Sequence, residues 1–130
     1  MSQPIDLTSA LATFDELWSP RIAARVNDYD VRITKVAGEY IWHVHTDTDE
    51  FFMVLDGELT IELRENGAER SVVLPKNSVY VVPRGIEHRP VSPAGASIMV
   101  IEPAGHSTVG DRHDDIPGHI DVTTGHRLTG

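Results

Sequence analysis

Four residues in two short segments have the types and spacing to hold one divalent metal ion: His43, His45, Glu50 and His88. Imidazole and carboxylate ligands suit iron, manganese, nickel, cobalt or zinc, and the chain has no cysteine that would select a softer ion. Four protein ligands on a six-coordinate ion leave positions for water, oxygen or substrate. Such a site is typical of catalysis rather than of a structural clamp.

The first three ligands are expected on two strands joined by a polar turn. Side chains at positions i and i+2 of a strand share a face, so His43 and His45 project together if this stretch is extended. The run from Thr46 to Asp49 predicts a turn, after which Glu50 begins an apolar strand that can lie opposite the histidines. An isolated His-x-His pair would more often be two strand histidines beside a solvated acid.

The second segment argues against that alternative. A β-rich run over residues 79–82 is followed by the turn Pro83-Arg84-Gly85, and His88 begins the next element. This histidine can complete a four-ligand site.

Together these residues resemble the motifs of the cupin superfamily. Its first motif is a glycine, His-x-His, a glutamate and a closing glycine, and its second is Pro-x-Gly-x-x-His. This chain carries both, as Gly38, His43, His45, Glu50 and Gly57, and as Pro83, Gly85 and His88. It departs from them in that Gly38 precedes His43 by one residue fewer than usual, and Asn77 and Ser92 replace a frequent glycine and asparagine. None of these three positions supplies a ligand.

The resemblance covers roughly residues 30 to 102 and is closest to small, mannose-6-phosphate-isomerase-like cupins of the second cupin type. It implies an all-β cupin barrel, also described as a double-stranded β-helix or jelly roll, with a metal centre and a homodimeric assembly. We expect one domain in three parts: an N-terminal helix and lead-in strand (1–29), the cupin barrel (30–102) and an irregular tail (103–130).

The hydrophobic pattern agrees with this division. Apolar residues at helical spacing predict an amphipathic helix over residues 6–18, capped by Thr8 or Ser9 and ended by Pro20. From residue 22 to 102, short β-branched runs alternate with turn residues, which predicts a sandwich or barrel. The run from Phe51 to Leu55 is apolar on both faces and needs a second cover, either the helix or another subunit. We therefore predict a homodimer.

Charge and composition exclude other classes of function. The formal net charge is −9, with 20 acidic residues against 11 lysines and arginines, so neither nucleic acid nor an anionic membrane is an expected partner. The chain start lacks a basic segment followed by an apolar one, and no apolar run has the length of a membrane span. We expect a cytoplasmic protein with a small-molecule substrate.

The tail raises two further possibilities. Its histidines, His106, His113, His119 and His126, invite a second metal site, but spacings of six or seven residues do not place them on one face, so solvated or packing roles are expected. The tail can instead fold over the barrel mouth as a lid, which would bring Arg112 or His113 to the substrate.

Three functions fit the predicted site: an iron-type dioxygenase, a Lewis-acid sugar isomerase, epimerase or lyase, and a non-catalytic metal-dependent binding protein. Isomerisation needs a base, for which Tyr40, Tyr80 and Glu87 are the candidates. Strand alternation predicts that Tyr40 and Trp42 point away from His43, and Glu87 is expected to be a surface or supporting acid. The catalytic residue is therefore unknown, and the lack of a base favours the dioxygenase. Candidate anchors for an anionic substrate, otherwise surface residues, are Arg32, Arg84 and Arg89.

Overall fold

The computed structural model describes residues 3–112 and 116–128. It contains one short helix, α1 (Leu7–Leu11), and eight strands. The strands are β1 (Arg21–Val26), β2 (Tyr29–Glu39), β3 (Glu50–Gly57), β4 (Leu59–Glu65), β5 (Ala68–Leu74), β6 (Val79–Val82), β7 (Glu87–Pro103) and β8 (His126–Arg127). The predicted all-β jelly-roll architecture is confirmed.

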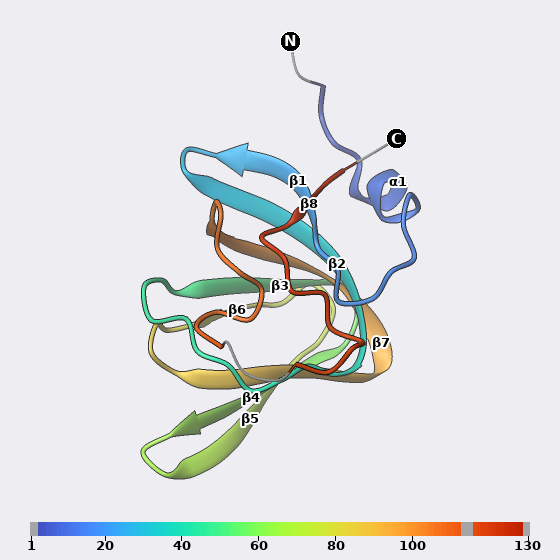
Figure 1. Ribbon diagram of the computed structural model, residues 1–130. Coiled ribbons are helices and arrows are strands. Elements are labelled where there is room, and N and C mark those ends of the chain that lie inside the picture. Colours follow the sequence, from blue (N-terminus) through green and yellow to red (C-terminus); the bar gives the residue numbers. More distant parts are fainter. Residues whose placement is uncertain (1–2, 113–115, 129–130) are drawn as a thin grey trace.

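The long strand β7 joins the two halves of the fold (Figure 1). Along one path the strands are ordered β5-β4-β7-β2-β1-β8, while β3 pairs with both β6 and β7. The first part of β7 pairs with β4 and its second part with β3, and β2 follows it along most of its length. The chain therefore wraps one eight-stranded sheet around an interior.

The turn signals in the sequence mostly fall between strands. Asn66 and Gly67, with φ of 54° and 78°, form the tight connection of the β4–β5 hairpin. The turn-forming residues Pro93, Ala94 and Gly95 instead lie inside β7. There β7 bends without losing its partner, because β2 follows the bend through a register shift between Val36 and Gly38.

The helix is shorter than predicted. Asp6, rather than Thr8 or Ser9, caps it by accepting a hydrogen bond of 2.9 Å from the backbone of Ser9, and the helix ends at Leu11 rather than near Pro20. The hydroxyl of Thr13 donates to the carbonyl of Ala10, which offers the backbone an alternative to the next turn.

The apolar residues that predicted the helix still reach the core, but individually. Phe14 and Trp18 are both 5 % exposed although they lie outside the helix. Trp18 has a φ of 56°, and its backbone donates to the carbonyl of Lys35 on β2. Helical spacing here reflected which side chains are buried rather than the path of the backbone.

Two apolar clusters hold the fold together. The larger fills the interior of the barrel, and the smaller packs α1 and the following segment against Ile33 and Leu55. The expected second cover of the β3 run is thus supplied in part by the N-terminal segment.

The tail crosses the open side of the barrel (Figure 1) and ends in β8, which pairs in parallel with β1. Val109 and Ile120 from this tail are buried in the larger cluster. Within residues 3–112 and 116–128, no helix has the length and apolar character that a membrane crossing requires.

Candidate metal centre

The four predicted ligands meet at one point inside the barrel. Glu50 is the first residue of β3 and His88 the second of β7, as the sequence predicted for the starts of these elements. His43 and His45 lie between β2 and β3, where only His43 forms a bridge, with hydrogen bonds of 3.0 Å in each direction to the backbone of His88. All four side chains are buried, and one ligand atom from each lies within 4.8 Å of those of the others.

Backbone carbonyls orient two of the imidazole rings. Nδ1 of His43 donates to the carbonyl of Ile41 at 2.8 Å, and Nδ1 of His88 donates to that of Ile86 at 2.9 Å. With its Nδ1 proton held in this way, Nε2 of the neutral His43 presents a lone pair to the centre. Carbonyl partners of this kind commonly fix the tautomer of metal-binding histidines.

Glu50 contacts two of the three histidines, His45 and His88. Its Oε1 lies 3.0 Å from Nε2 of His88 and 3.4 Å from Nε2 of His45. Burial opposes its ionisation, but the adjacent imidazoles of His45 and His88 prevail and hold the pKa of Glu50 well below its usual value. The carboxylate is therefore ionised and able to bind a cation at neutral pH.

The two neighbouring histidines differ in protonation. Burial, assisted by the charge of His88, lowers the pKa of His43 to about 3, so this ring is neutral at pH 7. Burial also favours neutral His45, but the adjacent carboxylate of Glu50 outweighs it and raises the pKa of His45 above its usual value.

These residues fit a divalent ion. Both ring nitrogens of His45 are buried and have no hydrogen-bond partner, which is unusual for polar atoms in a protein interior. Three imidazoles and one carboxylate suit the borderline ions named above. The group could hold one metal ion, and among the described residues it is the one cluster of His, Cys, Asp or Glu side chains with this capacity.

The centre opens onto a cavity of about 60 Å³ within the barrel. Its walls are mostly apolar, and Trp18, Phe52, Ile98 and Val100 contribute to them. His43 and Glu50 line it from the ligand group, and Arg32, Thr34, Tyr40 and Glu102 add polar groups. A cavity of this size admits only a compact molecule.

One side of the cavity carries buried charge. Arg32, 1 % exposed, contacts Glu102, lies 3.3 Å from Asp30 and donates to the carbonyl of His106 at 3.1 Å. Burial, followed by the negative charge of Glu50, raises the pKa of Glu102 well above its usual range against the opposing charge of Arg32. Arg32 is therefore an interior residue, contrary to the expectation of a surface arginine.

The prediction for Tyr40 was also wrong. β2 ends at Glu39, so strand alternation does not extend to Tyr40, and its ring lies edge-on to His43 with 5.2 Å between centroids. The Tyr40 hydroxyl donates to the carbonyl of Thr108 at 3.1 Å. Burial raises the pKa of Tyr40 above its usual value, so it remains protonated and does not serve as a base.

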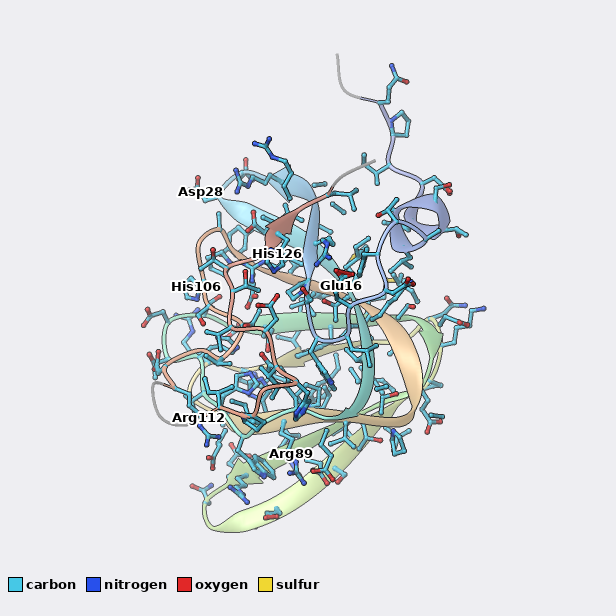
Figure 2. The ribbon with its side chains drawn as sticks, turned by 45° about the vertical axis from the view of Figure 1, so that its right-hand side comes forward. Glu16, Asp28, Arg89, His106, Arg112 and His126 are labelled. Carbon is cyan, nitrogen blue, oxygen red and sulfur yellow. The ribbon has the colours of Figure 1, made fainter. Side chains whose placement is uncertain are left out.

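The other candidates lie outside the cavity. Trp42 faces outward, as predicted, with the guanidinium of Arg64 3.7 Å from its ring centroid. Glu87 pairs with Arg64, Arg84 pairs with Asp49, and Arg89 pairs with Glu62 and Glu39 near the β4–β5 hairpin (Figure 2). Tyr80 packs at the edge of the apolar core and is not among the residues lining the cavity.

The tail packs directly against the segment that carries His43 and His45. The backbone of Asp111 donates to the carbonyl of Val44 at 3.0 Å, and the Arg112 guanidinium donates to the carbonyl of Trp42 at 2.9 Å. Arg112 lies where the tail passes the lower part of the barrel (Figure 2). Arg112 therefore supports the segment that carries His43 and His45.

Among the described residues, the tail histidines do not form a second metal site. His119 contacts the carbonyl of Glu39, and His126 pairs with Asp121. His106 contributes its backbone carbonyl to Arg32, whereas His113 lies outside the described residues.

Sequence reasoning missed three buried polar residues on this side of the barrel: Asp30, which pairs with Arg32, and Thr34 and Glu102, which line the cavity. With Arg32, the first two form a polar i, i+2, i+4 stripe on β2, which alternation alone assigns to a solvent face. This polar stripe is visible in the sequence, but only the burial of its side chains in the structure shows that it faces the interior.

Comparison with known proteins agrees with this architecture. A solved cupin-2 domain protein from Shewanella frigidimarina NCIMB 400 is 40% identical, with a TM-score of 0.72 over 76% of this chain and 93% of that one. The uncharacterised protein YdbB of Bacillus subtilis strain 168 is 42% identical over 66 residues, covering 51% of this chain and 56% of that protein.

A third relative has a named activity. The 3-hydroxyanthranilate 3,4-dioxygenase of Ruegeria pomeroyi (strain ATCC 700808 / DSM 15171 / DSS-3) is 33% identical over 79 residues, covering 58% of this chain and 44% of that enzyme. The chain thus spans about half the length of the curated relatives it matches. The family model for the cupin domain of the second type (Cupin_2) matches residues 31–102, and the chain belongs to that family.

Proposed function

We propose that this protein is a metal-dependent dioxygenase that acts on a compact organic molecule, with one divalent ion held by His43, His45, Glu50 and His88. The observation that carries the proposal is the buried three-histidine, one-carboxylate group facing a small, largely apolar cavity. When bound, iron would supply the electrons and the open coordination positions that a reaction with molecular oxygen requires.

The relation to a dioxygenase supports this choice. The Ruegeria pomeroyi relative is named for 3-hydroxyanthranilate, and a hydroxylated aromatic ring is a suitable probe for a cavity walled by Trp18 and Phe52. The mannose-6-phosphate-isomerase-like subtype, by contrast, stays a prediction.

The chain's own residues would bind the ion, orient the ligand side chains and exclude water from the cavity. The carbonyls of Ile41 and Ile86 hold the His43 and His88 rings, while apolar walls and the tail limit access of water to the cavity. No base serves an isomerisation well among the candidates, since Tyr40 is held protonated and Glu87 lies outside the cavity in an ion pair with Arg64. This is the reason to rank the isomerase, epimerase or lyase below the dioxygenase.

The test begins with elemental analysis of protein purified without added metal, with His45→Ala as the control. About one equivalent of metal per chain, absent from the variant, is expected. Oxygen consumption of the iron-loaded protein is then measured with catechol, 3-hydroxyanthranilate, small thiols and keto acids. Uptake with at least one compound supports the dioxygenase. Metal binding without uptake favours the Lewis-acid enzyme or the binding protein, and no metal after reconstitution contradicts all three.

We also propose a homodimer in the cytoplasm. Val79 and Val81, 58 % and 47 % exposed, lie on the same face of β6, which pairs only with β3 among the described strands. Sedimentation of the wild type beside Val81→Lys tests the assembly: a dimer that the substitution weakens is expected, and a monomeric wild type contradicts it.

A further inference from the structure

Three buried polar atoms on one side of the cavity have no hydrogen-bond partner: Nε of Arg32, Oγ1 of Thr34 and Oε2 of Glu102. Their residues are only 1 %, 6 % and 2 % exposed. Buried polar atoms in folded proteins are nearly always paired, so three together within one cavity point to a missing partner.

The pairing of β2 with β7 places these atoms in one group. Arg32 and Thr34 share a face of β2, and Glu102 lies opposite Asp30 on the neighbouring strand β7. Ile98 and Val100, on the same face of β7 as Glu102, also line the cavity. Glu50 lines it as well and contributes to the electrostatic environment of Glu102, so the group adjoins the metal centre.

The charges in this group argue against an anionic ligand. The Arg32 guanidinium already contacts two carboxyl groups, those of Asp30 and Glu102. An added carboxylate or phosphate would meet an arginine already compensated by Asp30 and the repulsion of the ionised Glu50. The anionic substrate for which Arg32 was a candidate anchor therefore does not suit this position.

The unpaired atoms suit a neutral hydroxyl. Nε of Arg32 is a donor, the Thr34 hydroxyl is both a donor and an acceptor, and the Glu102 carboxyl, whose raised pKa favours its protonated form, can donate from Oε2. A hydroxyl can accept one hydrogen bond and donate another, which no apolar, purely donating or purely accepting group can do.

We propose that Arg32, Thr34 and Glu102 form a subsite for a neutral substrate hydroxyl, which donates to Thr34 and accepts from Arg32 or Glu102. This deepens the proposed function, on which it rests for the ion's role. It defines the substrate as a compact, mostly apolar molecule whose hydroxyl occupies the polar side of the cavity.

The test measures binding rather than turnover. The chain has two tryptophans, of which Trp18 lines the cavity, so a Trp42→Phe background reports the cavity by fluorescence. Phenol, toluene and benzoate are titrated into the metal-free and zinc-loaded full chain. Phenol is expected to bind about tenfold tighter than toluene, the effect of one or two neutral hydrogen bonds, and tighter than benzoate.

Thr34→Val is the decisive variant because it keeps shape and charge. It should reduce the preference for phenol over toluene severalfold, Thr34→Ser should restore it, and Thr60→Val on β4, outside the cavity-lining residues, should leave it unchanged. Equal binding of phenol and toluene, tighter binding of benzoate, no binding of any probe, or no effect of Thr34→Val would each overturn the proposal. A hydroxyl preference without oxygen uptake would instead retain the subsite and contradict only the dioxygenase.

Discussion

The metal centre draws two ligands from strands and two from a loop, and the two pairs are supported differently. Glu50 and His88 lie at the starts of β3 and β7, where strand pairing fixes their directions. His43 and His45 lie in residues 40–49, which belong to no strand and are held by separate contacts. The backbone of Gly85 binds the carbonyl of His45, and the tail binds those of Trp42 and Val44.

This difference gives the tail a structural part in the metal centre. The sequence left open whether the tail forms a lid; in the structure its backbone packs against the loop of residues 40–49 and its apolar residues enter the core. Changes in the tail should therefore disturb His43 and His45 more than the strand pair.

The largest effect is expected from removing one ligand of each pair. His43→Ala and His88→Ala should both abolish tight binding of zinc or manganese. Each removes one metal ligand, and its loss has the same effect whether it lies in the loop or on a strand. Calorimetric titration of metal into each apoprotein measures this, with His119→Ala as a control whose side chain contacts Glu39 instead. Near-normal binding by His43→Ala would show that the loop pair is not part of the site.

A smaller effect is expected at the closest approach of tail and loop. Gly110 has a φ of 58°, and a Cβ there would lie 2.1 Å from the carbonyl oxygen of Val44 and 3.2 Å from Nδ1 of His45. Gly110→Ala must therefore move the tail or the loop, and we expect metal affinity to fall about 10- to 100-fold, as for residues that orient ligands.

Gly118→Ala is the matched control for this substitution, because a Cβ there meets nothing within 4 Å and its φ is not in the left-handed region. The strand pair supplies the second comparison: backbone amide exchange should increase in residues 43–45 of Gly110→Ala and remain low at the start of β7. Unchanged affinity would mean that the loop pair is positioned without the tail.

The same contrast explains what could be predicted from the sequence. The four ligands were found because cupin motifs preserve residue type and spacing, and Glu50 and His88 also followed from strand starts. The direction of Tyr40 was missed because alternation holds only within a strand, and β2 stops one residue earlier. Local rules therefore sufficed for the strand pair and failed in the loop.

The polar side of the cavity could not be predicted for a different reason. Arg32 and Thr34 alternate with Val31 and Ile33. This alternation is the same whether the polar face of the strand lies against solvent or against the interior of the protein. Here both faces are covered, Ile33 by the N-terminal segment and Arg32 by the barrel interior. The choice depends on contacts between β2, β7 and α1, which are distant in sequence.

The smallest predicted effect concerns pH. It separates the two loop ligands, His45 and His43, by their protonation in the apoprotein. At pH 6.5, His45 is more than half protonated because Glu50 raises its pKa, whereas His43, with a pKa of about 3, is already neutral. Metal binding should then release most of one proton, and apparent affinity should weaken by up to about tenfold per pH unit below the pKa of His45. Above that pKa the affinity should become independent of pH.

His45 should affect the stability of the apoprotein in the opposite direction: metal affinity weakens as pH falls, whereas the stabilisation from His45 is present at low pH. A raised pKa in the folded state means that His45 stabilises the fold below its unfolded value of 6.5, and this contribution disappears as pH rises through the folded value. Metal titrations at pH 6.5 in two buffers of different ionisation enthalpy count the released protons. Release of two would show that a second histidine ligand is also protonated in the apoprotein, and release of none would show that Glu50 does not hold a proton on His45.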